Sequence, residues 1–200
     1  MGFRWTTALS ILMAATPEVS GAQVPTPAAD ARAPERGEAM QGLIRALSGH
    51  WSLRLKFEPS REAPAGLEGT GEETWHAGPE GLTFTDEEVF HAGPSSVVVV
   101  GIFWRDLKTN AFHAMDCYKG NPHTCDLEGA ADVVVHWTGS ELTVDEKERS
   151  PQGTMMTSRI EWSDITATSF TETGYLAPPG GPFHKTMTVH ATRDAGQRGG

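Results

Sequence analysis

The fold is decided by residues 49–58, which read GHWSLRLKFE. Four apolar side chains from Trp51 to Phe57 alternate there with polar ones, and a period of two places them on one face of a β-strand. Just upstream, residues 40–47 carry apolar side chains at i, i+3, i+4 and i+7, the spacing of one helix face. We therefore predict a short amphipathic helix that runs into a half-buried strand, which is how many small ligand-binding β-barrels begin.

Further strand-like segments follow, rich in Val, Thr, Phe and Trp and separated by turn residues. No helical pattern interrupts them, so a parallel β-α-β arrangement is excluded. A sandwich or a barrel would bury their apolar faces, and the barrel is favoured because closure removes exposed edges. The prediction is an all-β, antiparallel up-and-down β-barrel of about 8–10 strands, with a short N-terminal amphipathic helix. The segments are 69–76, 82–90, 97–106, 111–118, 131–138, 141–149, 154–163, 168–175 and 183–193.

The chain divides into four parts by composition. Residues 1–22 resemble a signal peptide, with Arg4 before an apolar run too short for a membrane span and small residues before position 23; the alternative is a buried N-terminal helix. Residues 23–37 are predicted to be a disordered leader, 38–193 the barrel domain and 194–200 a flexible tail. We expect an exported protein, periplasmic or secreted, without membrane insertion.

Charge and cysteine content narrow the partners. The formal charge is −10 without any Lys/Arg cluster, so nucleic acid is excluded as a partner. Cys117 and Cys125 are the only cysteines, and they flank a turn-like segment. In an exported protein such a pair predicts a disulfide; a metal or redox pair is the alternative, but its usual spacing is missing.

Five short motifs lie across the domain: LSGHW (47–51), GTGEE (69–73), VVGIFWRD (99–106), RIEWSDI (159–165) and GPFHKTMTV (181–189). Together they resemble a bacterial domain-of-unknown-function family of exported, calycin-like proteins. The motif Gly49-His50-Trp51 also resembles the Gly-x-Trp of lipocalins. In lipocalins this tryptophan closes the base of the barrel and packs under an arginine from late in the sequence. The resemblance implies that Arg159 or Arg193 takes the part of this arginine. The resemblance implies the fold and no established activity or catalytic residue.

Catalytic, metal and cofactor signals are weak. The eight histidines include no HxH, HExxH or HxxxH pair, so no metal site is predicted, although distant histidines can converge inside a barrel. A haem bound by His113 or His190 is an alternative, but alternation places His190 opposite Met187 and Val189. Gly-x-Ser-x-Gly is absent. We predict no catalytic residue and no cofactor.

Carboxylates give one candidate polar group. Glu72–Glu73 and Asp86–Glu88 are consecutive, which sends neighbours to opposite faces and is typical of a charged exterior. Asp116 has apolar neighbours instead; if it points inward, burial raises its pKa and makes it a functional candidate.

The leading hypothesis is a small hydrophobic or amphipathic ligand in the barrel, since methionines beside aromatics suit such a site. An enzyme using the same cavity is the second hypothesis, favoured if the pocket holds an ionisable group with a shifted pKa. A filled barrel acting as a structural or interaction protein is the third, because the run 97–100 is apolar on both faces and a helix, loop or homodimer partner would cover it. The predicted ligand-binding residues are Trp104, Phe112, Met115, Asp116, Met155 and Arg159.

Overall fold

The computed structural model describes residues 36–60, 63–106, 108–109, 111–119, 125, 133–150 and 153–195. In this part of the chain a helix, α1, precedes ten β-strands, and a 3-10 turn, η1, lies between β2 and β3. The predicted signal peptide and most of the predicted leader lie outside the described residues. The elements are α1 (Arg36–Leu47), β1 (Gly49–Phe57), β2 (Leu67–Ala77), η1 (Pro79–Gly81), β3 (Thr83–Ala92), β4 (Ser95–Arg105), β5 (Phe112–Tyr118), β6 (Val134–Trp137), β7 (Leu142–Arg149), β8 (Met155–Ser163), β9 (Ser169–Ala177) and β10 (His184–Arg193).

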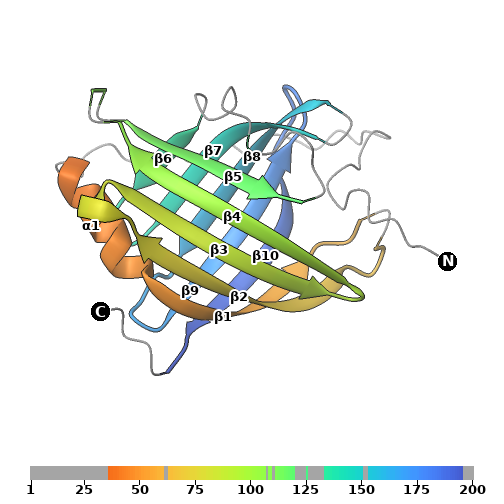
Figure 1. Ribbon diagram of the computed structural model, residues 1–200. Helices are drawn as coiled ribbons and strands as arrows, with labels where there is room; N and C mark the ends of the chain where they lie inside the picture. Colours follow the sequence, from red (N-terminus) through yellow and green to blue (C-terminus); the bar gives the residue numbers. More distant parts are fainter. Residues whose placement is uncertain are drawn as a thin grey trace.

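The strands form one antiparallel sheet in the order β5-β4-β3-β2-β1-β10-β9-β8-β7-β6. Every strand pairs with a neighbour in sequence, and β1 also pairs with β10, so the first and last strands lie side by side. The sheet curls into a nearly closed barrel whose seam lies between β5 and β6, while α1 lies at one end (Figure 1). The predicted all-β, antiparallel up-and-down barrel with one short N-terminal helix is therefore confirmed.

Trp51 and Arg193 close the barrel at the α1 end. The Trp51 side chain is fully buried and its indole N–H donates to the carbonyl of Leu47, 2.8 Å away. The Arg193 guanidinium lies 4.0 Å from the Trp51 ring centroid and donates to the carbonyls of Ala46 and Ser48. These carbonyls lie in the last turn of α1 and just beyond its end, where the helix dipole is negative, so a cation there is favourable. Of the two arginines considered from the lipocalin resemblance, Arg193 holds this place.

An aromatic layer fills the barrel above that base. The Trp75 ring lies 4.7 Å from Phe84, 5.6 Å from Phe103 and 6.3 Å from Trp162, measured between centroids. All four are buried, and side chains of α1 join the same core: Met40, Leu43 and Leu47. Dense aromatic packing of this kind dominates the burial of apolar surface, so the α1 end of the barrel is solid.

The disulfide prediction is also confirmed, since Cys117 and Cys125 are bonded with their Cα atoms 4.9 Å apart. Cys117 lies near the end of β5, and the backbone N–H of Cys125 donates to the carbonyl of Asp116. The bond therefore ties Cys125 to β5, at the seam. Among the described residues, no helix is long and apolar enough to cross a membrane.

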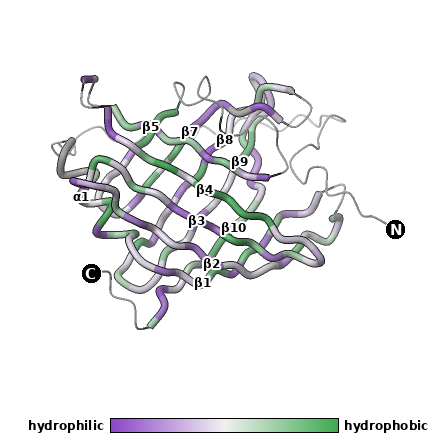
Figure 2. Tube along the Cα trace, in the orientation of Figure 1, coloured by the Kyte–Doolittle hydropathy of each residue, from purple (hydrophilic) through white to green (hydrophobic). Residues whose placement is uncertain are grey.

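The outer face of β4 remains apolar and exposed. Val98 and Val100 are 50% and 43% exposed, and the apolar run of this strand is green in Figure 2. Val97 and Val99, which alternate with them, face inward and are half-buried. No described segment covers the outer valines, so the predicted helix or loop cover is not seen in this part of the chain, and the homodimer stays a prediction.

Candidate functional site: carboxyls inside the barrel

Three glutamates from separate strands point into the barrel. Glu73, Glu88 and Glu172 are 1%, 8% and 3% exposed. Alternation fixes their direction, because each lies two residues from a buried aromatic or acidic side chain on the same face of its strand: Trp75 in β2, Asp86 in β3 and Phe170 in β9. The predicted charged exterior is therefore wrong for Glu73, Asp86 and Glu88, and right for the exposed Glu72 and Glu87.

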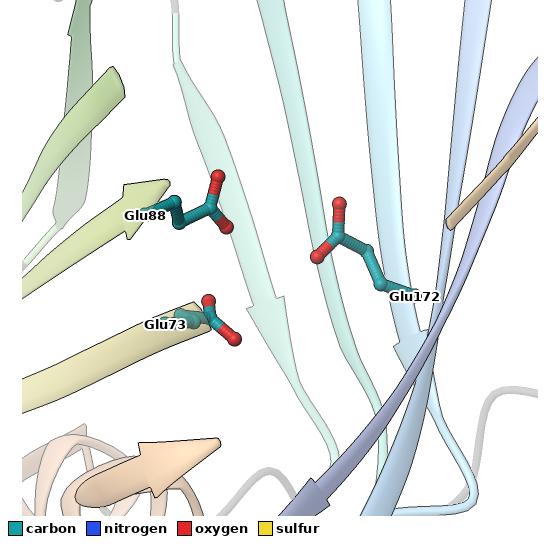
Figure 3. Close-up of side chains that lie close together, drawn as sticks. All are labelled: Glu73, Glu88 and Glu172. Atoms are coloured by element: carbon teal, nitrogen blue, oxygen red, sulfur yellow. The ribbon is translucent and has the colours of Figure 1, made fainter. Parts of the chain in front are cut away.

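These glutamates meet across the barrel. Glu73 and Glu88 are register partners in β2 and β3, so their side chains project from one wall. Glu172 projects from β9 toward them, as Figure 3 shows. One oxygen from each carboxyl lies within 4.8 Å of the other two. We call Glu73, Glu88 and Glu172 the glutamate triad.

Two aspartates extend the acidic lining. Asp86 in β3 and Asp116 in β5 are both register partners of Gly101 in β4, which lies between them. A Cβ on Gly101 would lie 2.1 Å from the Asp86 Oδ1 atom and 2.8 Å from the Asp116 Oδ1 atom. The bare backbone of Gly101 thus makes room for two carboxyls on one wall.

Burial raises the pKa of every one of these carboxyls. For Glu73, Asp86 and Glu88 desolvation is the main cause and repulsion by neighbouring carboxyls adds to it, so each pKa lies well above its ordinary value. Burial raises the pKa of Asp116 to about 6. Burial, followed by the charge of Asp116, raises the pKa of Glu172 to about 8. At neutral pH the interior therefore holds protons that a cation can displace.

Several polar atoms at this level lack a hydrogen-bond partner. Both Glu73 carboxyl oxygens, one Asp86 oxygen and the indole N–H groups of Trp75 and Trp162 are buried and unpaired. The two indoles lie close enough to lower the pKa of Glu73 and Glu172 but do not reach hydrogen-bonding geometry. Buried polar groups in folded proteins are nearly always paired with protein, water or ligand. These unpaired carboxyl oxygens and indole N–H groups are therefore available to form hydrogen bonds with a ligand.

Beyond the carboxyls, toward the end opposite α1, the inward side chains are apolar but only half-buried. Phe57, Phe90 and Met187 pack against the core yet keep some exposure. Val97 and Val99 in β4 are half-buried as well. Partial exposure of side chains that face inward means that space for solvent adjoins them. The barrel is thus solid at one end, acidic in the middle and loosely packed at the other end.

Comparison with known proteins supports the fold. No protein-family model and no curated protein matches the sequence. Among solved structures, Rv2717c from M. tuberculosis is similar at 11% identity, with a TM-score of 0.51 over 78% of this chain and 97% of that chain. The S-type phycobiliprotein lyase CPES from Guillardia theta matches at 9% identity and a TM-score of 0.43, over 81% of this chain and 97% of that one. The designed barrel mFAP1, solved bound to DFHBI, matches at 13% identity and 0.41, over 78% and 98%. At this low identity the match to Rv2717c supports the barrel fold alone, and the bacterial family resemblance stays a prediction.

Of the six predicted ligand-binding residues, the structure turns two inward. Asp116 pairs with the inward Gly101, and Phe112 pairs with Arg105, two residues from the buried Phe103. Asp116 therefore meets the condition stated for it from the sequence, because it points inward and burial raises its pKa to about 6.

The other four predicted residues lie on the outer face, which corrects that part of the prediction. Trp104 stacks on His113 outside the barrel, and Met115 pairs there with Ile102. Met155 is 39% exposed. Arg159 makes a bidentate ion pair with Asp145, at 2.6 and 2.8 Å, and lies over the Phe183 ring. None of these side chains reaches the barrel interior.

The two histidines weighed as haem ligands also point outward. His190 is exposed, as alternation predicts, and its ring lies 3.4 Å from the Thr171 hydroxyl. His113 faces the outer Trp104 ring. Neither residue can therefore reach a group held inside the barrel.

A metal ion is chemically compatible with the glutamate triad. Carboxylate oxygens are the ligands that Ca²⁺, Mg²⁺ and Mn²⁺ prefer, and three of them converge here. The expectation of no metal site rested on histidine spacing and did not address these carboxyls. Around them the side chains of Trp75 and Trp162 supply N–H donors, which cannot coordinate a metal.

Proposed function

We propose that the protein binds a small amphipathic molecule inside its barrel. The polar part of the ligand lies at the carboxyls, and its apolar part lies against the half-buried side chains near Phe90, Val99 and Met187. The observation that carries this proposal is the set of buried, unpaired polar atoms at the middle of the barrel. A ligand that pairs with them removes a cost of about 1–3 kcal/mol for each unsatisfied group.

A second candidate is acid–base catalysis by the same carboxyls. It is favoured by the pKa values of Asp116 and Glu172, about 6 and about 8, which suit proton transfer near neutral pH. We rank it second because burial and mutual repulsion account for these values. The charged groups that act on Glu73, Glu88 and Glu172 within the described chain are all carboxyls, and each raises the pKa of the others by repulsion or is itself buried.

Val99→Trp tests the binding proposal, because it fills the loosely packed end. Val99 faces inward as the register partner of the buried Glu88, whereas its neighbour Val98 faces outward. We expect Val99→Trp to weaken binding of a neutral apolar fluorophore, N-phenyl-1-naphthylamine, by at least about tenfold in a fluorescence titration. Val98→Trp adds the same side chain outside and should leave the affinity unchanged.

Folding of both variants is checked by circular dichroism, and Val99→Phe provides a smaller step if Val99→Trp does not fold. A wild-type protein that binds no fluorophore would contradict the proposal. So would equal affinity in all variants, because the fluorophore would then bind outside the barrel.

A further inference from the structure

We propose that the polar group of the ligand is a primary ammonium that binds at the glutamate triad. This inference rests on the proposed function and adds the chemical class of the ligand: an alkyl or aryl amine whose carbon chain extends toward the loosely packed end. It concerns Glu73, Glu88 and Glu172, which converge from β2, β3 and β9 (Figure 3).

The geometry of the triad matches an ammonium. A primary ammonium has three N–H donors, and charge-assisted N–H···O bonds are about 2.8 Å long. Three acceptors arranged tetrahedrally at that distance lie about 4.6 Å apart. The three carboxyl oxygens lie within 4.8 Å of one another, and one comes from each glutamate. Each donor therefore has its own acceptor.

Charge supports the same class of ligand. Glu73, Glu88 and Glu172 are influenced by one another, by Asp86 and by Asp116, all of which are acids. The inward Arg193 is committed to the Trp51 ring and to backbone carbonyls at the base. Buried charges in proteins are paired. A cationic group of the ligand supplies the positive charge that the described residues acting on these carboxyls do not.

The apolar surroundings separate an organic cation from a metal ion. A metal ion uses the carboxyls but makes no contact with the half-buried Phe57, Phe90 and Met187. An amine uses both features, because its carbon chain continues into this apolar region. The unpaired N–H groups of Trp75 and Trp162 lie beside the carboxyls and donate hydrogen bonds to them once the carboxyls ionise.

Isothermal titration calorimetry with three probes of equal chain length tests the inference. We expect octylamine to bind the wild-type protein at least about tenfold more tightly than 1-octanol, and octanoate to bind more weakly still. Glu73→Gln should remove most of the preference for the amine. Glu72→Gln is the matched control, since this neighbouring residue is exposed and faces outward, and it should keep the preference.

The affinity for octylamine should also rise from about pH 6 to about pH 8.5. The amine stays protonated in this range while the carboxyls that face it, Glu73, Glu88 and Glu172 with Asp86 and Asp116 beyond them, lose their protons. Octanol binding should not change with pH. Glu172→Gln, from the opposite wall, repeats the test if Glu73→Gln does not fold.

The outcomes separate the two proposals. Equal binding of octanol and octylamine overturns the ammonium inference and leaves the proposed function standing. Binding of Ca²⁺ or Mn²⁺ that depends on Glu73, without amine binding, overturns the inference in favour of a metal site. If none of the three probes binds and the fluorophore does not bind either, the proposed function fails as well.

Discussion

Raising the pH from about 5 to about 8.5 is expected to destabilise the ligand-free protein by on the order of 4 kcal/mol through Glu172 alone. Its pKa is about 8 in the folded protein, against an ordinary value of 4.5. The folded state therefore binds more protons than the unfolded state between these values, and stability falls as the pH rises through that window. Glu73, Asp86 and Glu88 act in the same direction, because burial raises their pKa values too. Urea denaturation at several pH values measures the effect.

Glu172→Gln is the variant that isolates this effect. The amide does not titrate, so the pH dependence should flatten, and the variant should be more stable than the wild type at about pH 8.5. Glu72→Gln, on the outer face of β2, should leave the dependence as it is. Lowered pKa values at the partly exposed Glu58 and Asp106 act only below about pH 4.5 and do not enter this range. Stability that increases with pH would contradict the assignment of buried carboxyls.

Trp51→Ala should destabilise the protein by about 3–5 kcal/mol, the range for a large aromatic removed from a core. The Trp51 side chain is fully buried and packs edge-on against Phe170 at 4.7 Å. Its removal also takes the ring away from the Arg193 guanidinium and the donor away from the Leu47 carbonyl. Guanidinium denaturation monitored by circular dichroism measures the change.

Trp104→Ala is the control for that prediction. Trp104 is a tryptophan of the same sheet, but it lies on the outer face and stacks on His113. We expect its removal to cost about 1 kcal/mol or less, as is usual for surface positions. Similar losses in the two variants would mean that Trp51 does not hold the base of the barrel.

The fold could be predicted from sequence because alternation and turns are local signals. Residues 49–58 carry one apolar face, and that face is buried in β1. For the arginine that packs on Trp51, the sequence left two candidates, Arg159 and Arg193. It could not choose between them because the observed register partners, Trp51 and Arg193, are 142 residues apart in sequence. Local patterns define strands, but they do not state which distant strand closes a barrel.

The acidic interior was missed although a signal was present. Phe84, Asp86, Glu88 and Phe90 alternate on one face of β3, so two aromatics bracket two acids there. Consecutive carboxylates favour the exterior, whereas two acids spaced on one face between two aromatics indicate the interior. The opposite error occurred in β5, where Phe112, Met115 and Asp116 include both faces of the strand. A segment that is apolar on both faces gives no rule for choosing the inner one.

The position of β1 between β2 and β10 has a consequence for how the chain reaches this structure. β10 is the last of the described strands in sequence order, yet it completes the sheet beside the first strand and holds the base. During synthesis the barrel cannot close until that last strand has emerged. Contacts between such distant segments slow folding to the millisecond-to-second range in proteins of this kind. Until then one edge of β1 is unpaired. A strand of another chain can pair with that edge, so the incomplete barrel is prone to aggregate.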